Sequence, residues 1–227
     1  MTVTARESCN DPSTIKPVRC DDTIHTQFVE KDPADTEYAI LSHPWDSKGE
    51  QTYKQLRNRN DTIQPLSGTG TSPPRSEAHA NGYQYIWIDS CCIDKSSSSK
   101  FSVAINSMYA WYARTKVYHA YLADVPAGGD HRRAWSPFRK SRWFTRGWTL
   151  QELIAPLDVV FLSWDWAVIG PKAFLHVESL DRFSVAQRLS WAARRETTKE
   201  EIMRRIPDYS LFAWGEVYLG SQTSAPT

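Results

Sequence analysis

Short apolar runs separated by polar stretches dominate the chain, and each of these runs predicts a strand. Four of them are rich in β-branched and aromatic residues, at 38–42, 83–89, 117–122 and 159–162. The run at 38–42 is short and apolar enough to predict a central strand.

Patterns with a helical period lie between these runs. Phe101, Ile105, Met108 and Tyr112 recur on one face of a 3.6-residue period, after serines at 96–99 that offer N-caps. Further helices are predicted at 50–59 and 183–195. Alternation of strands and helices predicts right-handed crossovers. The predicted fold is therefore a three-layer α/β architecture with a mainly parallel sheet flanked by helices.

A fourth helix is predicted inside the stretch 141–163. Thr149 is placed as an N-cap, and Glu152 follows three residues later, which together fit a capping box. Pro156 ends this helix because proline lacks the amide that the next turn needs.

Regularity differs between parts of the chain. Residues 1–36 lack periodicity and hold three prolines, which predicts a loosely ordered N-terminal arm. Residues 37–198 carry the predicted elements and form one domain, with a flexible insertion at about 60–80 that is rich in Gly, Ser, Thr and Pro. Residues 199–227 are predicted to be a C-terminal remnant with a disordered tail.

Composition excludes several classes of protein. Lys plus Arg total 27 against 26 Asp plus Glu, so a net charge of +1 gives no general attraction to nucleic acid. No apolar run approaches the roughly 18–20 residues of a membrane span, and the polar N-terminus predicts no signal peptide. Four cysteines, two of them adjacent at Cys91 and Cys92, fit no disulfide scaffold. A reduced, cytoplasmic protein is the prediction.

Polar side chains follow the predicted strands, where ligands bind in open parallel sheets. These residues are Ser42, His43, Asp46, Asp89, Asp94 and Asp124. Four of them have a plainer explanation. Ser42 and His43 lack a third orienting group, so a structural histidine is favoured over nucleophilic catalysis. Asp89 at a strand end is more often a helix-cap or loop-stabilising acid, and a surface pair with Lys95 is favoured for Asp94.

The stretch 141–163 holds the other candidates. Arg142 and Arg146 either bind a pyrophosphate through forked hydrogen bonds or pair with acids. Trp143 and Trp148 either stack on a ligand or fill the core. The cysteines lack the spacing of metal ligands. No glycine-rich phosphate-binding motif occurs, which argues against dehydrogenases and kinase-like enzymes.

Three blocks of the sequence resemble a known family. Residues 38–45, 85–95 and 142–153 look like the signature blocks of the fungal heterokaryon incompatibility (HET) domain, in the same order. The resemblance implies a role in non-self recognition and cell death. The HET domain is distantly similar to the Toll/interleukin-receptor (TIR) domain, which has a flavodoxin-like fold and in some members cleaves NAD. That similarity implies a catalytic role for Glu152. The candidate ligand-binding residues are Ser42, His43, Trp45, Asp89, Asp94, Arg142, Trp143, Arg146 and Trp148.

Three functions stay open. The first is cell-death signalling through protein partners or self-association, without a cofactor. The second is NAD glycohydrolase activity with NAD as substrate, in which the Glu152 carboxylate stabilises positive charge on the ribose. The third is an inactive truncated paralogue, because the chain is shorter than the family's pattern before Gly82, between residues 172 and 184, and after residue 198. These gaps imply a HET domain with internal deletions.

Overall fold

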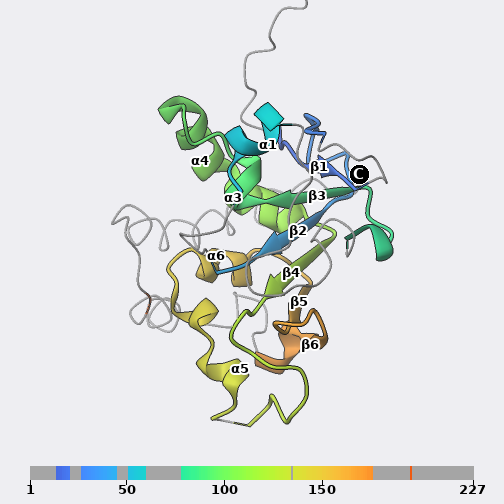
Figure 1. Ribbon diagram of the computed structural model, residues 1–227, viewed down its shortest axis with the longest axis vertical. Coiled ribbons are helices and arrows are strands. Elements are labelled where there is room, and N and C mark those ends of the chain that lie inside the picture. Colours follow the sequence, from blue (N-terminus) through green and yellow to red (C-terminus); the bar gives the residue numbers. More distant parts are fainter. Residues whose placement is uncertain are drawn as a thin grey trace, which may run out of the picture. The chain divides into compact units, whose positions relative to one another are not determined.

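A mixed six-stranded sheet with flanking helices forms the fold in the computed structural model, which describes residues 14–20, 27–44, 51–59, 78–133, 135–175 and 195 (Figure 1). The strand order is β1-β3-β2-β4-β5-β6. The predicted α/β class is confirmed, although only part of the sheet is parallel. The chain divides into two compact units, residues 1–119 and 120–227, and each is described by itself.

The strands are β1 (Val18–Arg19), β2 (Ala39–Ser42), β3 (Tyr85–Ile88), β4 (Val117–Tyr121), β5 (Val159–Leu162) and β6 (Val168–Pro171). The helices are α1 (Tyr53–Arg59), α3 (Asp89–Cys92), α4 (Ser98–Arg114), α5 (Pro137–Lys140) and α6 (Thr149–Ile154), with 3-10 turns η1 (Arg142–Thr145) and η2 (Lys172–Leu175).

Two parallel strands form the centre of the first unit. β2 pairs with β3 in the register Ala39↔Ile86 and Leu41↔Ile88. All four residues of β2 are buried, as the short and mainly apolar run at 38–42 predicts. The predicted strands at 38–42 and 83–89 are confirmed, and β2 lies in the interior of the sheet between β3 and β4.

The sheet begins with an antiparallel edge that the sequence did not predict. β1 pairs antiparallel with β3 through Val18↔Ile86, and bridges join Ile15 to Lys31 and Val18 to Phe28. Ile15 and Val18 are fully buried. The described residues of the N-terminal arm are therefore held by sheet pairing, where the sequence predicted no element.

Helix α4 is part of the first unit and contributes aromatic side chains to its core. Ser97 is its N-cap and accepts a hydrogen bond from the Lys100 amide at 3.4 Å, so the predicted serine cap is confirmed. The buried face is formed by Ala104, Met108, Trp111 and Tyr112. Phe101 and Ile105, which the predicted stripe includes, are only partly buried. The helical period was right, and the buried face is rotated toward Trp111.

The second unit has a core of aromatic rings under β5. Phe138 lies 5.0 Å from Phe161, and Trp143 lies 5.8 Å from the same ring. β6 pairs antiparallel with β5, with an irregularity in register between Phe161 and Leu162. The strand at 159–162 is confirmed, whereas β6 was not predicted. Because β1 and β6 pair antiparallel, the predicted parallel character of the sheet is confirmed only in part.

Several predictions fall outside the described residues. They concern the tail at 199–227, the helix at 183–195 apart from residue 195, and the insertion at about 60–80 apart from residues 78–80. Trp45 and Asp46 also lie outside. Among the residues described, no helix is both long and apolar enough to cross a bilayer.

Candidate functional site

The first unit brings three predicted site residues to one edge of its sheet. Leu41 of β2 pairs with Ile88 of β3, so Ser42 and Asp89, which follow them, lie side by side at the carboxyl ends of two parallel strands. Ser42 and His43 are buried, with 6% and 3% of their surface exposed, whereas Asp89 is half-buried in the first turn of α3. This edge is where the sequence predicted a ligand site. Trp45, assigned to the same site, lies outside the described residues.

Asp94 is held by the chain that leads into α4. Its Oδ1 accepts hydrogen bonds from the Ser96 hydroxyl at 2.5 Å and the Ser96 amide at 3.1 Å. Its Oδ2 lies 3.9 Å from Lys100 Nζ. The Ser96 hydroxyl in particular holds the pKa of Asp94 below its usual value. Asp94 thus pairs with Lys100, whereas the sequence predicted Lys95 as its partner.

Arg142 pairs with an acid, as one of its two predicted explanations requires. The Asp124 carboxylate accepts the Ser141 hydroxyl at 2.6 Å and the Arg142 amide at 2.8 Å. Arg142 Nε lies 3.5 Å from the same carboxylate, and its side chain is exposed. Asp124 therefore caps the start of η1 rather than facing a ligand.

Trp143 belongs to the core of the second unit. Its side chain is fully buried and makes edge-to-face contacts with Phe144 at 5.1 Å and Phe161 at 5.8 Å. Its ring is therefore enclosed by protein, and the core-filling alternative describes it better than stacking on a ligand.

Helix α6 begins differently from the predicted capping box. Its N-cap is Trp148, in a helical backbone conformation and without a side-chain cap. Thr149 lies inside the helix, and its hydroxyl donates to the carbonyls of Trp143 at 2.6 Å and Arg146 at 2.8 Å. The Thr149 hydroxyl is drawn away from the cap by these two carbonyls, which sequence spacing does not show.

Glu152 faces a cation that the sequence did not predict. Arg195 Nη1 donates to the Arg146 carbonyl at 3.0 Å and to the Thr149 hydroxyl at 2.7 Å. Burial lowers the pKa of Arg195 to about 10, and the Glu152 carboxylate opposes that shift. Only 4% of Glu152 is exposed. Thr149 and Glu152, which are buried, and Arg195, which is half-buried, thus form a polar cluster in which the carboxylate balances the guanidinium.

Gln151 is the second residue that sequence reasoning missed. It is 5% exposed, and both polar atoms of its amide are buried without a hydrogen-bond partner within the described part of the chain. Such a group costs about 1–3 kcal/mol of stability. No sequence signal marks it, because a glutamine in a helix is normally solvated. It adds an unsatisfied donor and acceptor to the segment that carries Glu152.

The described residues contain no group of three or more His, Cys, Asp or Glu side chains that could hold a metal ion. Cys91 and Cys92 are buried free thiols, and burial raises the pKa of Cys92 well above its ordinary value. A thiol of raised pKa is a poor nucleophile at neutral pH. The two cysteines are therefore core residues, as predicted.

Comparison with known proteins identifies a domain in part of the chain. The sequence model of the heterokaryon incompatibility protein (HET) family matches residues 38–130. The chain is also 40% identical over 203 residues to the vegetative incompatibility protein HET-E-1 of Podospora anserina. The chain carries a HET domain. That alignment covers 80% of this chain and 14% of HET-E-1, so the chain spans about one seventh of its relative's length.

The HET domain match includes Ser42, His43, Asp89 and Asp94. Residues 142–153 lie beyond that match, but an alignment covering four-fifths of the chain includes them. A second model, described only as a domain of unknown function (DUF8212), matches residues 192–227 and so takes in Arg195. No solved structure matches the chain.

Proposed function

We propose that this chain acts in fungal heterokaryon incompatibility, where its HET domain triggers cell death after fusion with a non-self cell. The observation that carries this proposal is the 40% identity to a vegetative incompatibility protein over four-fifths of the chain. The chain acts in the cytoplasm through contacts with other proteins or with further copies of itself.

The geometry around α6 supports signalling over catalysis. Glu152 is 4% exposed and balances the charge of Arg195. Trp143, a candidate for stacking on a ligand, is enclosed in the core. Glu152 and Trp143 already make contacts within the protein. They therefore stabilise the fold rather than supply a reacting carboxylate and a stacking surface.

One observation favours an NAD glycohydrolase as the second candidate. The amide of Gln151 is buried and unsatisfied next to Glu152 in sequence. Polar groups held out of water without protein partners are common where a ligand binds. In that case Glu152 would stabilise the oxocarbenium-like charge on the ribose, as carboxylates do in glycosidases.

The test combines a cellular and a chemical readout. The full chain is expressed from an inducible promoter in a filamentous fungus, and dying cells are counted with a vital dye. Purified protein is assayed in parallel for nicotinamide release from NAD. Wild type is compared with Glu152→Gln and with Glu37→Gln, the same change at a glutamate whose side chain is 76% exposed.

The proposal expects cell death on expression of wild type and of Glu37→Gln, and no nicotinamide release. A folded, expressed wild-type chain that leaves cells viable would overturn it. Nicotinamide release that disappears in a folded Glu152→Gln protein would instead establish the enzyme. A melting curve on each purified variant separates loss of chemistry from loss of fold.

A further inference from the structure

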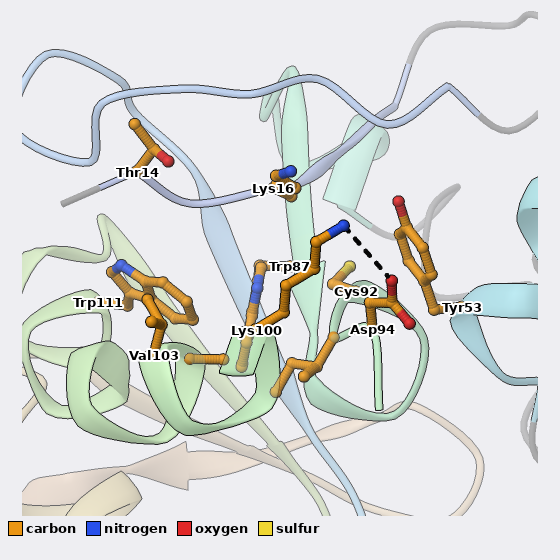
Figure 2. Close-up of a pocket in the computed structure, with 11 residues that line it drawn as sticks. Thr14, Lys16, Tyr53, Trp87, Cys92, Asp94, Lys100, Val103 and Trp111 are labelled. Atoms are coloured by element: carbon orange, nitrogen blue, oxygen red, sulfur yellow. Dashed lines mark ion pairs between the residues drawn. The ribbon is translucent and has the colours of Figure 1, made fainter. Parts of the chain in front are cut away.

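The first unit has a pocket in which lysines lie near tryptophan rings (Figure 2). Its tryptophans are closed to a partner, because only 1% of Trp87 and 5% of Trp111 is exposed. Figure 2 shows the Lys100 side chain extended toward Asp94, and these two groups lie 3.9 Å apart. The pocket therefore offers cations without an accessible indole ring.

The second unit carries an exposed tryptophan among cations. Trp135 is 81% exposed and belongs to the segment 131–142, in which five residues are Arg or Lys and none is Asp or Glu. In Figure 1, α5 and the yellow-green segment that leads into it lie at the lower end of the second unit. We call Trp135 and the five exposed cations of this segment the basic surface. The cations are Arg132, Arg133, Arg139, Lys140 and Arg142.

Acidic side chains leave most of this positive charge uncompensated. Arg142 Nε lies 3.5 Å from the Asp124 carboxylate. Within the described part of the chain, no carboxylate forms an ion pair with Arg133, Arg139 or Lys140. The Debye length is about 10 Å at 0.1 M ionic strength, so cations on such a short segment act together on a charged partner. The basic surface is therefore a local concentration of charge in a chain whose net charge is only +1.

Hydrogen bonds and buried rings hold the segment in a defined conformation. The Ser136 hydroxyl donates to the His131 carbonyl at 2.8 Å and accepts the Arg139 amide at 3.4 Å, as the N-cap of α5. Phe138 is 1% exposed, and its ring centre lies 5.0 Å from that of Phe161. The exposed residues are thus presented from an ordered backbone, which reduces the entropy lost on binding.

Trp135 and Lys140 together have the character of a membrane-surface contact. Lys140 Nζ lies 5.6 Å from the centre of the Trp135 ring, so charge and indole lie side by side. Tryptophan is enriched at membrane–water interfaces because its ring is amphipathic. A surface for single-stranded nucleic acid would instead present several rings on which successive bases stack. Phe138, the next aromatic ring along the segment, is buried.

We propose that the basic surface docks onto a bilayer that contains anionic phospholipids. The Trp135 indole enters the headgroup region, and the five cations contact the lipid phosphates and carboxylates. Each Lys or Arg close to an anionic leaflet strengthens such binding about fivefold. The contact is peripheral and reversible. It goes beyond the proposed role in incompatibility and does not depend on it.

The test is co-sedimentation of the full chain with vesicles of phosphatidylcholine alone and with vesicles that also contain about 30 mol% phosphatidylserine. We expect binding to the anionic vesicles, little binding to the neutral vesicles, and release by salt of about 1 M through screening. Arg133→Gln combined with Lys140→Gln should weaken binding about 25-fold, at about fivefold for each charge. Trp135→Ala should weaken it about tenfold, because the indole then no longer leaves water.

The matched controls lie outside the segment. Arg114→Gln combined with Lys116→Gln removes two exposed charges of the first unit, and Leu157→Ala truncates an apolar side chain that is 86% exposed. Both should bind as wild type does, with unchanged melting curves. The proposal is overturned if anionic vesicles do not bind, if neutral vesicles bind equally well, or if the Arg133/Lys140 double variant matches the Arg114/Lys116 one. Binding of labelled oligothymidylate in place of vesicles would assign the surface to nucleic acid and overturn the proposal as well.

Discussion

Neutralising Glu152 should destabilise the second unit through Arg195. In Glu152→Gln the guanidinium keeps its hydrogen bonds to the Arg146 carbonyl and the Thr149 hydroxyl but loses the carboxylate that balances its charge. Burial already lowers the pKa of Arg195 from 12.5 to about 10 with Glu152 present. Loss of the Glu152 carboxylate therefore raises the free energy of the folded state. It does not affect the unfolded state in the same way, because there the guanidinium is fully hydrated.

The expected loss can be bounded. Removing one partner of a buried ion pair costs about 3–5 kcal/mol. Arg195 is only half-buried and retains two hydrogen bonds, which place this case at the lower end, about 3 kcal/mol. For a chain of this size each kcal/mol lowers Tm by about 2–4 °C, so Tm should fall by about 6–12 °C.

The assay is urea unfolding followed by circular dichroism, with a thermal melt on the same samples. Glu37→Gln makes the same chemical change in an exposed pair with Lys116 at 3.1 Å and should hardly move the midpoint. Arg195→Met combined with Glu152→Gln removes both charges and should recover part of the loss. If Glu152→Gln melts no lower than Glu37→Gln, Glu152 does not balance Arg195 and the reasoning is refuted.

Two further predictions concern other buried polar groups. Burial lowers the pKa of His119 from 6.5 to about 4, so the unfolded chain takes up its proton first as the pH falls, and stability is lost below about pH 6.5. Between pH 7 and about pH 4.5, His119 should lower the free energy of unfolding, measured with urea, by about 2–3 kcal/mol. In His119→Gln this part of the pH dependence should be absent. Asp124→Ala removes the acceptor of the Ser141 hydroxyl and the Arg142 amide, and should cost about 1–2 kcal/mol.

Each of these has an outcome that would contradict it. A pH profile that is the same for wild type and His119→Gln would mean that His119 does not titrate in this range. Asp124→Asn keeps one acceptor oxygen and serves as the conservative control. If Asp124→Ala were as stable as Asp124→Asn, the cap at the start of η1 would not stabilise the fold.

The interior strands of the sheet were predictable because strands buried on both faces consist mainly of apolar residues. β2, β3, β4 and β5 fall within the mainly apolar runs at 38–42, 83–89, 117–122 and 159–162. β1 has two residues and β6 ends in Gly170 and Pro171, so neither has an intrinsic strand preference. Their pairing is imposed by β3 and β5, which only the folded chain provides.

The candidate site was less predictable because residue type does not reveal what a side chain touches. Trp143 has the chemistry of a stacking residue but is buried against Phe161. The Thr149–Glu152 spacing fits a capping box, yet two nearby carbonyls take the Thr149 hydroxyl. Arg195 lies 46 residues along the chain from Thr149 in the hydrogen bond that joins them, and no local pattern predicts such a contact.

The two unpredicted strands limit how the sheet can grow. Exposed edges with regular free amides are templates on which other chains add strands and form aggregates. At one edge β1 is only two residues long and is bridged to Phe28, and at the other β6 carries Pro171, which has no amide to offer. The irregular register of β6 against β5 disturbs that edge further. Uncontrolled polymerisation by strand addition is therefore disfavoured, and copies that do assemble would have to meet through side-chain surfaces, which mutation can switch off without unravelling the sheet.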